Sequence, residues 1–271
     1  MVNKNQSPSI LIAQPTTGTV VSQTVGFLAG LFRTLSDRGI HWGYSALELS
    51  DIAFSRNIFA SNVIADNEFT HLLFIDSDMG FLPETILGLL EFNKPVTAVA
   101  CPKRHLPWDH LIRLAAAEIG KPKDQRHTTK SLVDVALDYN VYNKNFDGSD
   151  WVAERDGNFI KVPAVGTGVM LIHRDVFEIM LAKDVARPRT GHKAPGLLIE
   201  GAPYCDFFSQ MPTPDGSLIE SEDISFCKRW VEDCGGEIWV DIDSRILHYG
   251  MRGHGGRYMP RAMDDFPEID Q

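Results

Sequence analysis

The feature that most constrains the fold is a repeated alternation of short apolar segments with helix-period segments through the first hundred residues. The apolar segments are predicted strands, at 9–13, 44–49, 71–76 and 96–100. Between them, apolar residues recur at helical spacings, which predicts helices over 19–36 and 51–66 and a third that begins at Pro83. This alternation predicts an α/β fold in which helices flank a mostly parallel, doubly wound sheet.

The predicted strand at 71–76 indicates where a ligand would bind. Its sequence, HLLFID, is apolar on consecutive positions, as expected when both faces of a sheet are covered. Ligands of doubly wound sheets bind beyond the carboxyl ends of the parallel strands. The acidic residues that end this strand therefore lie where a ligand is expected.

Beyond Cys101 the regular alternation stops. Residues 102–158 are polar and irregular, with one predicted helix near 111–119 and a charged segment, 121–130, that is predicted to be a mobile loop. Later strands are predicted at 158–165, 169–172, 237–243 and 244–249, and later helices at 175–182 and 223–234. With no internal repeat and no clear linker, we expect one domain over 1–271, with two halves that meet near residue 101 and a flexible tail over 251–271.

The composition excludes several function classes. A hydrophobic content of 44% with 23% charged residues is ordinary globular composition. The net charge of −10 argues against nucleic-acid binding and against adsorption to anionic membranes. No segment approaches the roughly 18–20 apolar residues that span a bilayer, and the N-terminal apolar run is too short for a signal peptide, so we expect a cytoplasmic protein with no integral membrane segment. The four cysteines lack C-x-x-C spacing and are expected to be free, buried thiols.

Two carboxylates separated by one residue, Asp76 and Asp78, end the 71–76 strand in the sequence FIDSDM. Such a pair can turn toward one cation, and Mg²⁺ and Mn²⁺ prefer oxygen ligands and often sit between carboxylates and substrate phosphates. The structural alternative is a turn whose aspartates cap the next element. D-x-D also opens haloacid-dehalogenase phosphatases, but those require Thr or Val where this chain has Gly80.

Two later segments carry further candidate groups. Glu222 and Asp223 stand at the start of a predicted helix, where a carboxylate is stabilised in its ionised form and can serve as a general base. N-capping alone is the alternative. His248 follows a short apolar strand and precedes a glycine, so it can offer an imidazole to a metal, or it is a packed core residue.

Glycines and cations supply the remaining candidates. Gly166 and Gly168 flank Thr167 between two predicted strands, either to let a ligand approach the backbone or to make a tight turn. Lys103 and Arg104 follow the fourth strand, where cations can meet phosphate. Trp108 can stack on a sugar or base, and Arg56 on the second helix can face a nucleotide; the alternative for each is a solvated surface.

Together and in this order, these segments resemble the GT-A glycosyltransferases, especially the family 2-like group. The resemblance runs from about Ile10 to Tyr258. It rests on a strand-loop start, an Arg-bearing helix, a D-x-D strand end, a Gly-rich turn, an E-D pair and a late histidine: ILIAQPT, SRNIFASNVI, HLLFIDSDM, VGTGVMLI, SEDISF and ILHYG. It implies a Rossmann-like GT-A fold with a nucleotide-binding half over 9–101 and an acceptor-binding half over 102–250.

The resemblance also implies roles for individual residues. Asp76 and Asp78 are expected beside the donor's ribose and diphosphate, and the expected ligands of Mn²⁺ or Mg²⁺ are Asp76, Asp78 and His248. Asp223, with Glu222 beside it, is expected to be the base that deprotonates an acceptor hydroxyl. The nucleotide-sugar donor is expected to contact Pro15, Thr16, Arg56, Asp76, Ser77 and Lys103. The acceptor is expected to contact Trp108, Gly166, Thr167 and Gly168.

The implied reaction is an inverting single displacement from a nucleotide sugar, with UDP as the default nucleotide, to a glycan, lipid, protein or small-molecule hydroxyl. The chain departs from the family in two places. Its first strand ends in AQPTTGT rather than P-x-Y/F-N, and it lacks the Q-x-x-R-W segment of processive synthases, which favours transfer of a single sugar. Two alternatives remain: a sugar nucleotidyltransferase, whose Gly-rich start this chain does not match, and a nucleotide-sugar-binding or scaffold protein with a decayed site.

Overall fold

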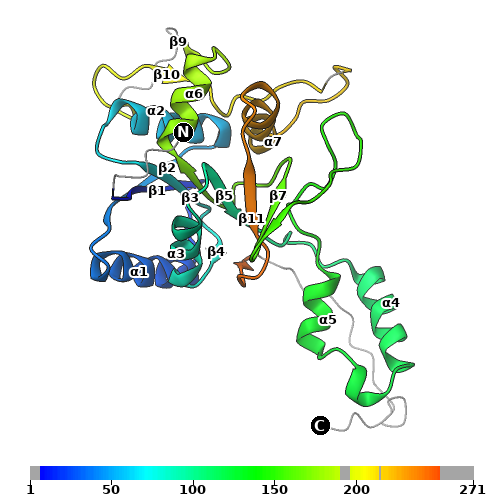
Figure 1. Ribbon diagram of the computed structural model, residues 1–271. Coiled ribbons are helices and arrows are strands. Elements are labelled where there is room, and N and C mark those ends of the chain that lie inside the picture. Colours follow the sequence, from blue (N-terminus) through cyan, green and yellow to red (C-terminus); the bar gives the residue numbers. More distant parts are fainter. Residues whose placement is uncertain (1–6, 190–195, 214, 251–271) are drawn as a thin grey trace.

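The computed structural model describes residues 7–189, 196–213 and 215–250. An eight-stranded sheet with the order β2-β1-β3-β8-β5-β11-β7-β6 lies at its centre, with helices on both sides (Figure 1). The strands are β1 (Ser9–Thr16), β2 (His41–Glu48), β3 (His71–Ile75), β5 (Val96–Val99), β6 (Arg155–Asp156), β7 (Phe159–Val162), β8 (Val169–His173) and β11 (Ile238–Asp241). The predicted α/β class, with helices flanking a central sheet, is confirmed.

Most strands of the sheet share one direction. β1 pairs in parallel with β2 and β3, and β5 pairs in parallel with β11. β8 lies antiparallel between β3 and β5, and β7 is antiparallel to β11 and β6. The mostly parallel sheet is therefore as predicted, and the insertion of β8 between β3 and β5 brings strands from both sides of residue 101 into one sheet.

The helices divide between two apolar layers. α1 (Ser22–Asp37) and α3 (Pro83–Phe92) contribute to the core on one face of the sheet. α2 (Ile52–Ala65), α6 (Arg174–Ala182) and α7 (Glu222–Lys228) contribute to the core on the other face, and Figure 1 shows the two groups on opposite sides. The complete burial of β3 follows from this covering, and it accounts for the unbroken apolar sequence HLLFI.

Local signals set the helix starts in the first half. The Asp51 carboxylate accepts a hydrogen bond of 3.0 Å from the Phe54 N–H and caps α2. Pro83 occupies the first turn of α3, where its missing N–H costs no hydrogen bond. β1 continues through Pro15, which pairs with Leu47 of β2, so this strand runs further than the apolar sequence alone predicts.

A helical hairpin projects from the sheet after β5. It consists of α4 (Trp108–Ile119), the 3-10 turn η1 (Lys123–Gln125) and α5 (Thr129–Ala136), and we call it the α4–α5 hairpin. The Thr128 hydroxyl accepts a hydrogen bond of 3.1 Å from the Ser131 N–H and caps α5. The prediction of a loop throughout 121–130 was wrong in part, because η1 and the first residues of α5 lie within this segment.

The late part of the chain contributes short elements. The predicted helix at 223–234 divides into α7 and the π-helix η2 (Arg229–Asp233). The predicted strand at 244–249 shrinks to β12 (Leu247–His248), which pairs with β4 (Met79–Gly80) outside the main sheet. Another two-stranded pair joins β9 (Pro188–Arg189) to β10 (Tyr204–Cys205).

Three remaining expectations concern the whole chain. All four cysteines are free and buried, as predicted. No helix in the part of the chain that the structure describes is long and apolar enough to cross a membrane. The predicted flexible tail, 251–271, lies outside the described residues.

Candidate active site

The D-x-D segment lies at the carboxyl end of β3, between the ends of its neighbours. The Asp76 N–H donates a hydrogen bond of 3.0 Å to the Gly168 carbonyl, which immediately precedes β8. The Ser77 carbonyl accepts a hydrogen bond of 2.9 Å from the Val21 N–H at the start of α1. The loops that follow β1 and β3 therefore meet at the sheet edge where a ligand is expected.

Asp78 and His248 come together because β4 pairs with β12. Met79 is opposite His248 in this short ladder, and the Tyr249 N–H donates to the Asp78 carbonyl over 2.9 Å. The His248 Nε2 atom lies 3.4 Å from Asp78 Oδ2, and both side chains are largely buried. The sequence predicts these two residues as metal ligands, and the structure makes them neighbours.

The backbone fixes the orientation of the His248 ring. Its Nδ1 atom lies 2.7 Å from the Pro102 carbonyl oxygen, which can only accept, so Nδ1 carries the proton. In the neutral ring, Nε2 then presents a lone pair to the Asp78 carboxylate. Two acceptors at this separation are stabilised when a cation, either a proton or a metal ion, lies between them.

The charges around Asp78 and His248 shift both groups toward their ionised forms. Burial raises the pKa of Asp78, but the hydrogen bond and charge of His248 and the charge of Arg104 outweigh it, and the pKa is lowered. Burial lowers the pKa of His248, but Asp78 and the Pro102 carbonyl outweigh it, and the pKa is raised. The Arg104 Nη1 atom donates to Asp78 Oδ2 over 3.1 Å from a side chain that is 61% exposed, so this cation can move away from the carboxylate.

Arg56 joins the D-x-D segment to the E-D pair. Its Nη2 atom donates to Asp76 Oδ1 over 3.1 Å, and its Nε atom donates to Glu222 Oε1 over 3.3 Å. The guanidinium is buried and lies 5.0 Å from the centre of the Phe74 ring. Burial raises the pKa of Asp76, against the opposing effect of Arg56. The side chain predicted to face a nucleotide is thus a buried cation between two carboxylates.

Asp223, at the start of α7, faces the Gly-rich turn. Its Oδ1 atom accepts hydrogen bonds from the Ser221 hydroxyl and, over 2.8 Å, from the Ile224 N–H. Its Oδ2 atom lies 3.4 Å from where a Cβ on Gly166 would be. Glu222, which is predicted to act beside Asp223, forms an ion pair with Arg56 instead. The two neighbouring carboxylates therefore have different surroundings.

The Gly-rich turn packs tightly between these groups. A Cβ on Gly168 would lie 2.7 Å from Met79 Cε, and one on Gly166 would lie 3.1 Å from Asn140 Cβ. Thr167 is 2% exposed, and its hydroxyl has no hydrogen-bond partner among the described residues. The two glycines therefore allow close packing of the turn against the D-x-D segment and against the strand-like segment at Asn140.

The other predicted site residues differ in their exposure and in the elements that carry them. Pro15 and Thr16 end β1, and the Thr16 hydroxyl donates to the Thr19 carbonyl over 2.8 Å. The Lys103 N–H donates a hydrogen bond of 2.7 Å to the Asp138 carbonyl. The Lys103 side chain is exposed. Trp108 begins α4 and is 48% exposed, so it belongs to the α4–α5 hairpin rather than to the buried cluster.

Sequence patterns did not predict two contributors to the site. The Pro102 carbonyl orients His248, and Asn140 packs against Gly166 and accepts a hydrogen bond of 2.9 Å from its N–H through the backbone. Backbone carbonyls leave no signature in side-chain sequence. Lys103 and Arg104, which the sequence predicts to lie near a phosphate, directly follow Pro102. These two cations were the one sequence feature that indicated that the segment after β5 contributes to the site.

The side chains of Asp78 and His248 would suit a divalent cation that is also coordinated by a bound ligand. Among the residues that the structure describes, no three His, Cys, Asp or Glu side chains gather closely enough to hold a metal by themselves. Asp78 and His248 supply one carboxylate and one imidazole, while Asp76 is paired with Arg56. Such partial sites suit Mg²⁺ or Mn²⁺, which are commonly held by one or two protein groups, water and substrate phosphates.

Comparisons of the chain with protein families, curated proteins and solved structures found similarity only among the solved structures. No protein-family model matches it, and no curated protein matches it. Among solved structures, A197 from STIV is similar with a TM-score of 0.46 and 14% identity, over 93% of this chain and 98% of that one. A glycosyltransferase involved in glycosylation of the major capsid of PBCV-1 is similar with a TM-score of 0.29 and 15% identity, over 64% of this chain and 63% of that one.

A third similar structure is mannose-1-phosphate geranyltransferase from Thermus thermophilus. Its TM-score is 0.36 at 9% identity, over 89% of this chain and 76% of that one. Similarity at this level assigns no activity to this chain. A functional proposal therefore rests on the geometry of its own residues.

Proposed function

We propose that this protein transfers a sugar from a nucleotide-sugar donor, with UDP as the nucleotide, to an acceptor hydroxyl in a metal-dependent, inverting reaction. The observation that carries the proposal is the pair formed by Asp78 and His248 at the carboxyl end of β3, with the His248 lone pair held toward the carboxylate. One carboxylate and one imidazole would suit a divalent cation that binds together with an anionic diphosphate.

Asp78 and His248 would hold Mn²⁺ or Mg²⁺. The cation would supply charge neutralisation for the nucleoside diphosphate as it leaves. Arg104 contacts the same Asp78 oxygen from an exposed side chain, so it can turn to a phosphate oxygen when the donor binds. Asp76, held by Arg56, is available through its other oxygen to accept hydrogen bonds from the donor's ribose.

Asp223 would act as the base. Its Oδ1 atom is held by two donors, and its Oδ2 atom is directed to the turn at Gly166, where an acceptor hydroxyl would approach. The hydroxyl proton passes to Asp223 as the hydroxyl oxygen forms a bond to the anomeric carbon. The bond from that carbon to the β-phosphate oxygen breaks on the opposite side, and the electron pair leaves with the diphosphate.

The test is calorimetric titration of the full chain with UDP, GDP and ADP, each with Mn²⁺ and with a chelator. We expect one nucleotide to bind only when the metal is present, and Asp78→Asn to remove that binding. Asp156→Asn, an exposed carboxylate on the edge strand β6, is the matched control and should bind as wild type. Absence of binding by folded protein for all three nucleotides would favour the decayed-site alternative.

A further inference from the structure

The segment over 139–142 lies between the Gly-rich turn and the chain that leaves β5, and backbone hydrogen bonds hold it on both sides. The Asn140 N–H donates to the Cys101 carbonyl over 3.0 Å. The Asn140 carbonyl accepts a hydrogen bond of 2.9 Å from the Gly166 N–H. These bonds fix where the side chains of the segment lie relative to the turn.

The side chains of Asn140 and Asp223 approach the same point at this turn. The Asn140 Nδ2 atom and the Asp223 Oδ2 atom each lie 3.4 Å from where a Cβ on Gly166 would be. The other oxygen of Asp223 already accepts two hydrogen bonds. Within the part of the chain that the structure describes, neither Asp223 Oδ2 nor Asn140 Nδ2 has a hydrogen-bond partner. A donor and an acceptor are therefore free beside the space that Gly166 leaves open.

Tyr142 offers an aromatic ring near the same carboxylate. It is 47% exposed, so part of its ring is open to a ligand. Burial raises the pKa of Tyr142, and the nearby charges of Asp223 and Glu220 raise it further, so its hydroxyl stays protonated at neutral pH. An aromatic ring and a free amide therefore accompany the carboxylate that is proposed to act as the base.

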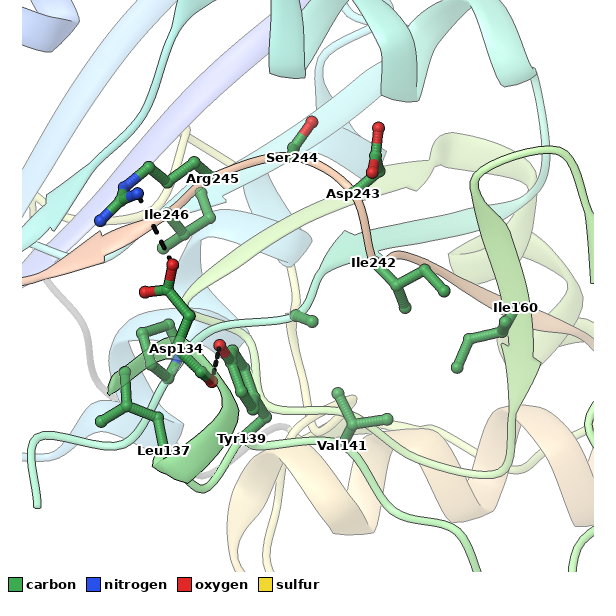
Figure 2. A pocket seen from close by; sticks show the side chains of 12 residues that line it. Asp134, Leu137, Tyr139, Val141, Ile160, Ile242, Asp243, Ser244, Arg245 and Ile246 are labelled. Atoms are coloured by element: carbon green, nitrogen blue, oxygen red, sulfur yellow. Dashed lines mark hydrogen bonds and ion pairs between the residues drawn. The ribbon is translucent and has the colours of Figure 1, made fainter. Parts of the chain in front are cut away.

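The neighbouring side chains of the same segment face a different environment. Tyr139 and Val141 line an apolar hollow of about 600 Å³, and Figure 2 shows it with Leu137 and Ile160 along its wall. Among the described residues that line this hollow, neither Tyr142 nor the proposed base is present. A hydroxyl that reaches the base therefore meets polar groups and an aromatic ring rather than an apolar groove.

We propose that Asn140 and Tyr142 bind a carbohydrate acceptor at Asp223, so that the hydroxyl that is glycosylated belongs to a sugar ring. A sugar has C–H groups on its faces, and one such face packs on the Tyr142 ring, whose π face carries partial negative charge. One sugar hydroxyl donates to Asp223 Oδ2 and accepts from Asn140 Nδ2, which gives both groups a partner. This inference rests on the proposed transfer reaction and names its acceptor class.

The same groups suit the alternative acceptors less well. A lipid alcohol needs an apolar surface for its chain, and that surface lies in the hollow lined by Tyr139 and Val141. A serine or threonine side chain of a protein acceptor brings one hydroxyl but no flat C–H face for Tyr142. A sugar ring brings both, together with further hydroxyls that can reach the carboxylate of Glu220.

The experiment is saturation-transfer NMR on the full chain without donor. A panel of methyl glycosides is compared with two alcohols that are not sugars, N-acetylserine amide and hexanol. We expect at least one glycoside to bind, with its strongest signals from the C–H groups of one ring face, and neither of the other alcohols to bind. Tyr142→Ala should weaken this binding about tenfold, and Asn140→Ala about 3- to 10-fold. Tyr142→Phe keeps the ring and should bind within about twofold of wild type.

The matched controls are Tyr139→Ala and Asn143→Ala, which remove the same residue types from the same stretch of chain. Tyr139 is 39% exposed and lines the hollow, and Asn143 is exposed beyond Tyr142. Both controls should bind the glycoside as wild type does, and circular dichroism should show that all variants are folded. Weaker glycoside binding in Tyr139→Ala but not in Tyr142→Ala would move the acceptor to the hollow and overturn the proposal.

Calorimetry with the Mn²⁺–nucleotide complex separates this inference from the transfer reaction on which it rests. Tyr142→Ala and Asn140→Ala should bind the complex within about twofold of wild type, while turnover shows a raised KM for the glycoside alone. Nucleotide binding by wild type with no glycoside signal would overturn the carbohydrate acceptor and leave the transfer reaction standing. Absence of nucleotide binding would overturn the transfer reaction itself. Equal glycoside binding by wild type, Tyr142→Ala and Asn140→Ala would also overturn the assignment of these two residues.

Discussion

The imidazole of His248 connects two distant parts of the chain: its Nε2 atom lies 3.4 Å from Asp78 Oδ2, and its Nδ1 atom lies 2.7 Å from the Pro102 carbonyl oxygen. The carbonyl fixes which nitrogen carries the proton, and so fixes which nitrogen faces the carboxylate. A carbonyl contact of this kind at the other ring nitrogen typically raises the affinity of a ligating histidine. The relationship makes His248 the most informative residue to change.

We expect His248→Ala to lower the affinity for a Mn²⁺–nucleotide complex by about 100-fold or more, since loss of even an outer partner typically costs about 10- to 100-fold. Calorimetric titration in the presence of Mn²⁺ measures this. Wild type in chelator is the matched control and should resemble the variant. Equal Mn²⁺–nucleotide affinity in variant and wild type would remove His248 from the metal site.

Arg56→Met should destabilise the fold by about 3–5 kcal/mol, because it leaves Asp76 and Glu222 without their shared cation. Urea unfolding measures the change. Glu222→Gln in the Arg56→Met background should recover part of the loss, since one of the two carboxylates is then neutral. Arg174→Met is the control, because it also removes a largely buried cation but one that donates to backbone carbonyls, those of Val63, Ile64 and Asp66. Adding Glu222→Gln to Arg174→Met should therefore recover no stability.

The first half of the fold follows from local sequence, and the site depends on contacts that local sequence does not encode. Periodicity and caps such as Asp51 predict the three strand–helix units because each signal acts within a few residues. The order of segments also predicts that Asp76 and Asp78 end β3. The insertion of β8, the β4–β12 ladder and the Arg56–Glu222 contact join residues far apart in the chain, where no short-range pattern applies.

The hairpin and the E-D pair show the same limit. The charged composition of 121–130 is typical of a loop. The structure nevertheless places Lys121 and His127 within hydrogen-bond distance of the Glu118 carboxylate, which holds the turn between α4 and α5. The roles of Asp223 as base and of Trp108 as an acceptor contact stay predictions. Glu222 was predicted beside Asp223 on sequence adjacency alone, whereas its contact with Arg56 depends on how α7 packs against α2.

Gly168→Ala should destabilise the fold by about 1–3 kcal/mol, because the added methyl group would lie 2.7 Å from Met79 Cε and 3.2 Å from Cys101 Sγ in a buried turn. Gly88→Ala is the matched control. Gly88 lies within α3 with nothing within 4 Å of the new Cβ, so this change should stabilise by about 0.5–1 kcal/mol. Thermal unfolding measures both, and a neutral Gly168→Ala would contradict the close packing of the turn.

Asp223→Asn should leave metal-dependent donor binding within about twofold of wild type and lower sugar transfer by about 100-fold or more, as loss of a general base does. Binding is measured by calorimetry, and transfer by release of the nucleoside diphosphate with an accepted hydroxyl substrate. Asp243→Asn, which changes an exposed carboxylate just after β11, should preserve both. Transfer at the wild-type rate in Asp223→Asn would assign the base to another residue.

Stability should fall on mild acidification because His71 is held neutral in the fold. Burial and the neighbouring His173 lower the pKa of His71 to about 3, and burial also lowers the pKa of His173. Between pH 7 and pH 5 the unfolded chain takes up a proton at His71 that the folded chain does not, so the free energy of unfolding should drop by about 2 kcal/mol from this residue.

Urea unfolding at the two pH values tests this, with His71→Leu and the exposed His110→Gln compared with wild type. His71→Leu should lose about 2 kcal/mol less than wild type between pH 7 and pH 5, because its unfolded state gains one proton fewer. His110→Gln should keep the wild-type difference. The same acid-induced loss in His71→Leu as in wild type would show that His71 takes up its proton in the folded protein, which burial beside His173 opposes.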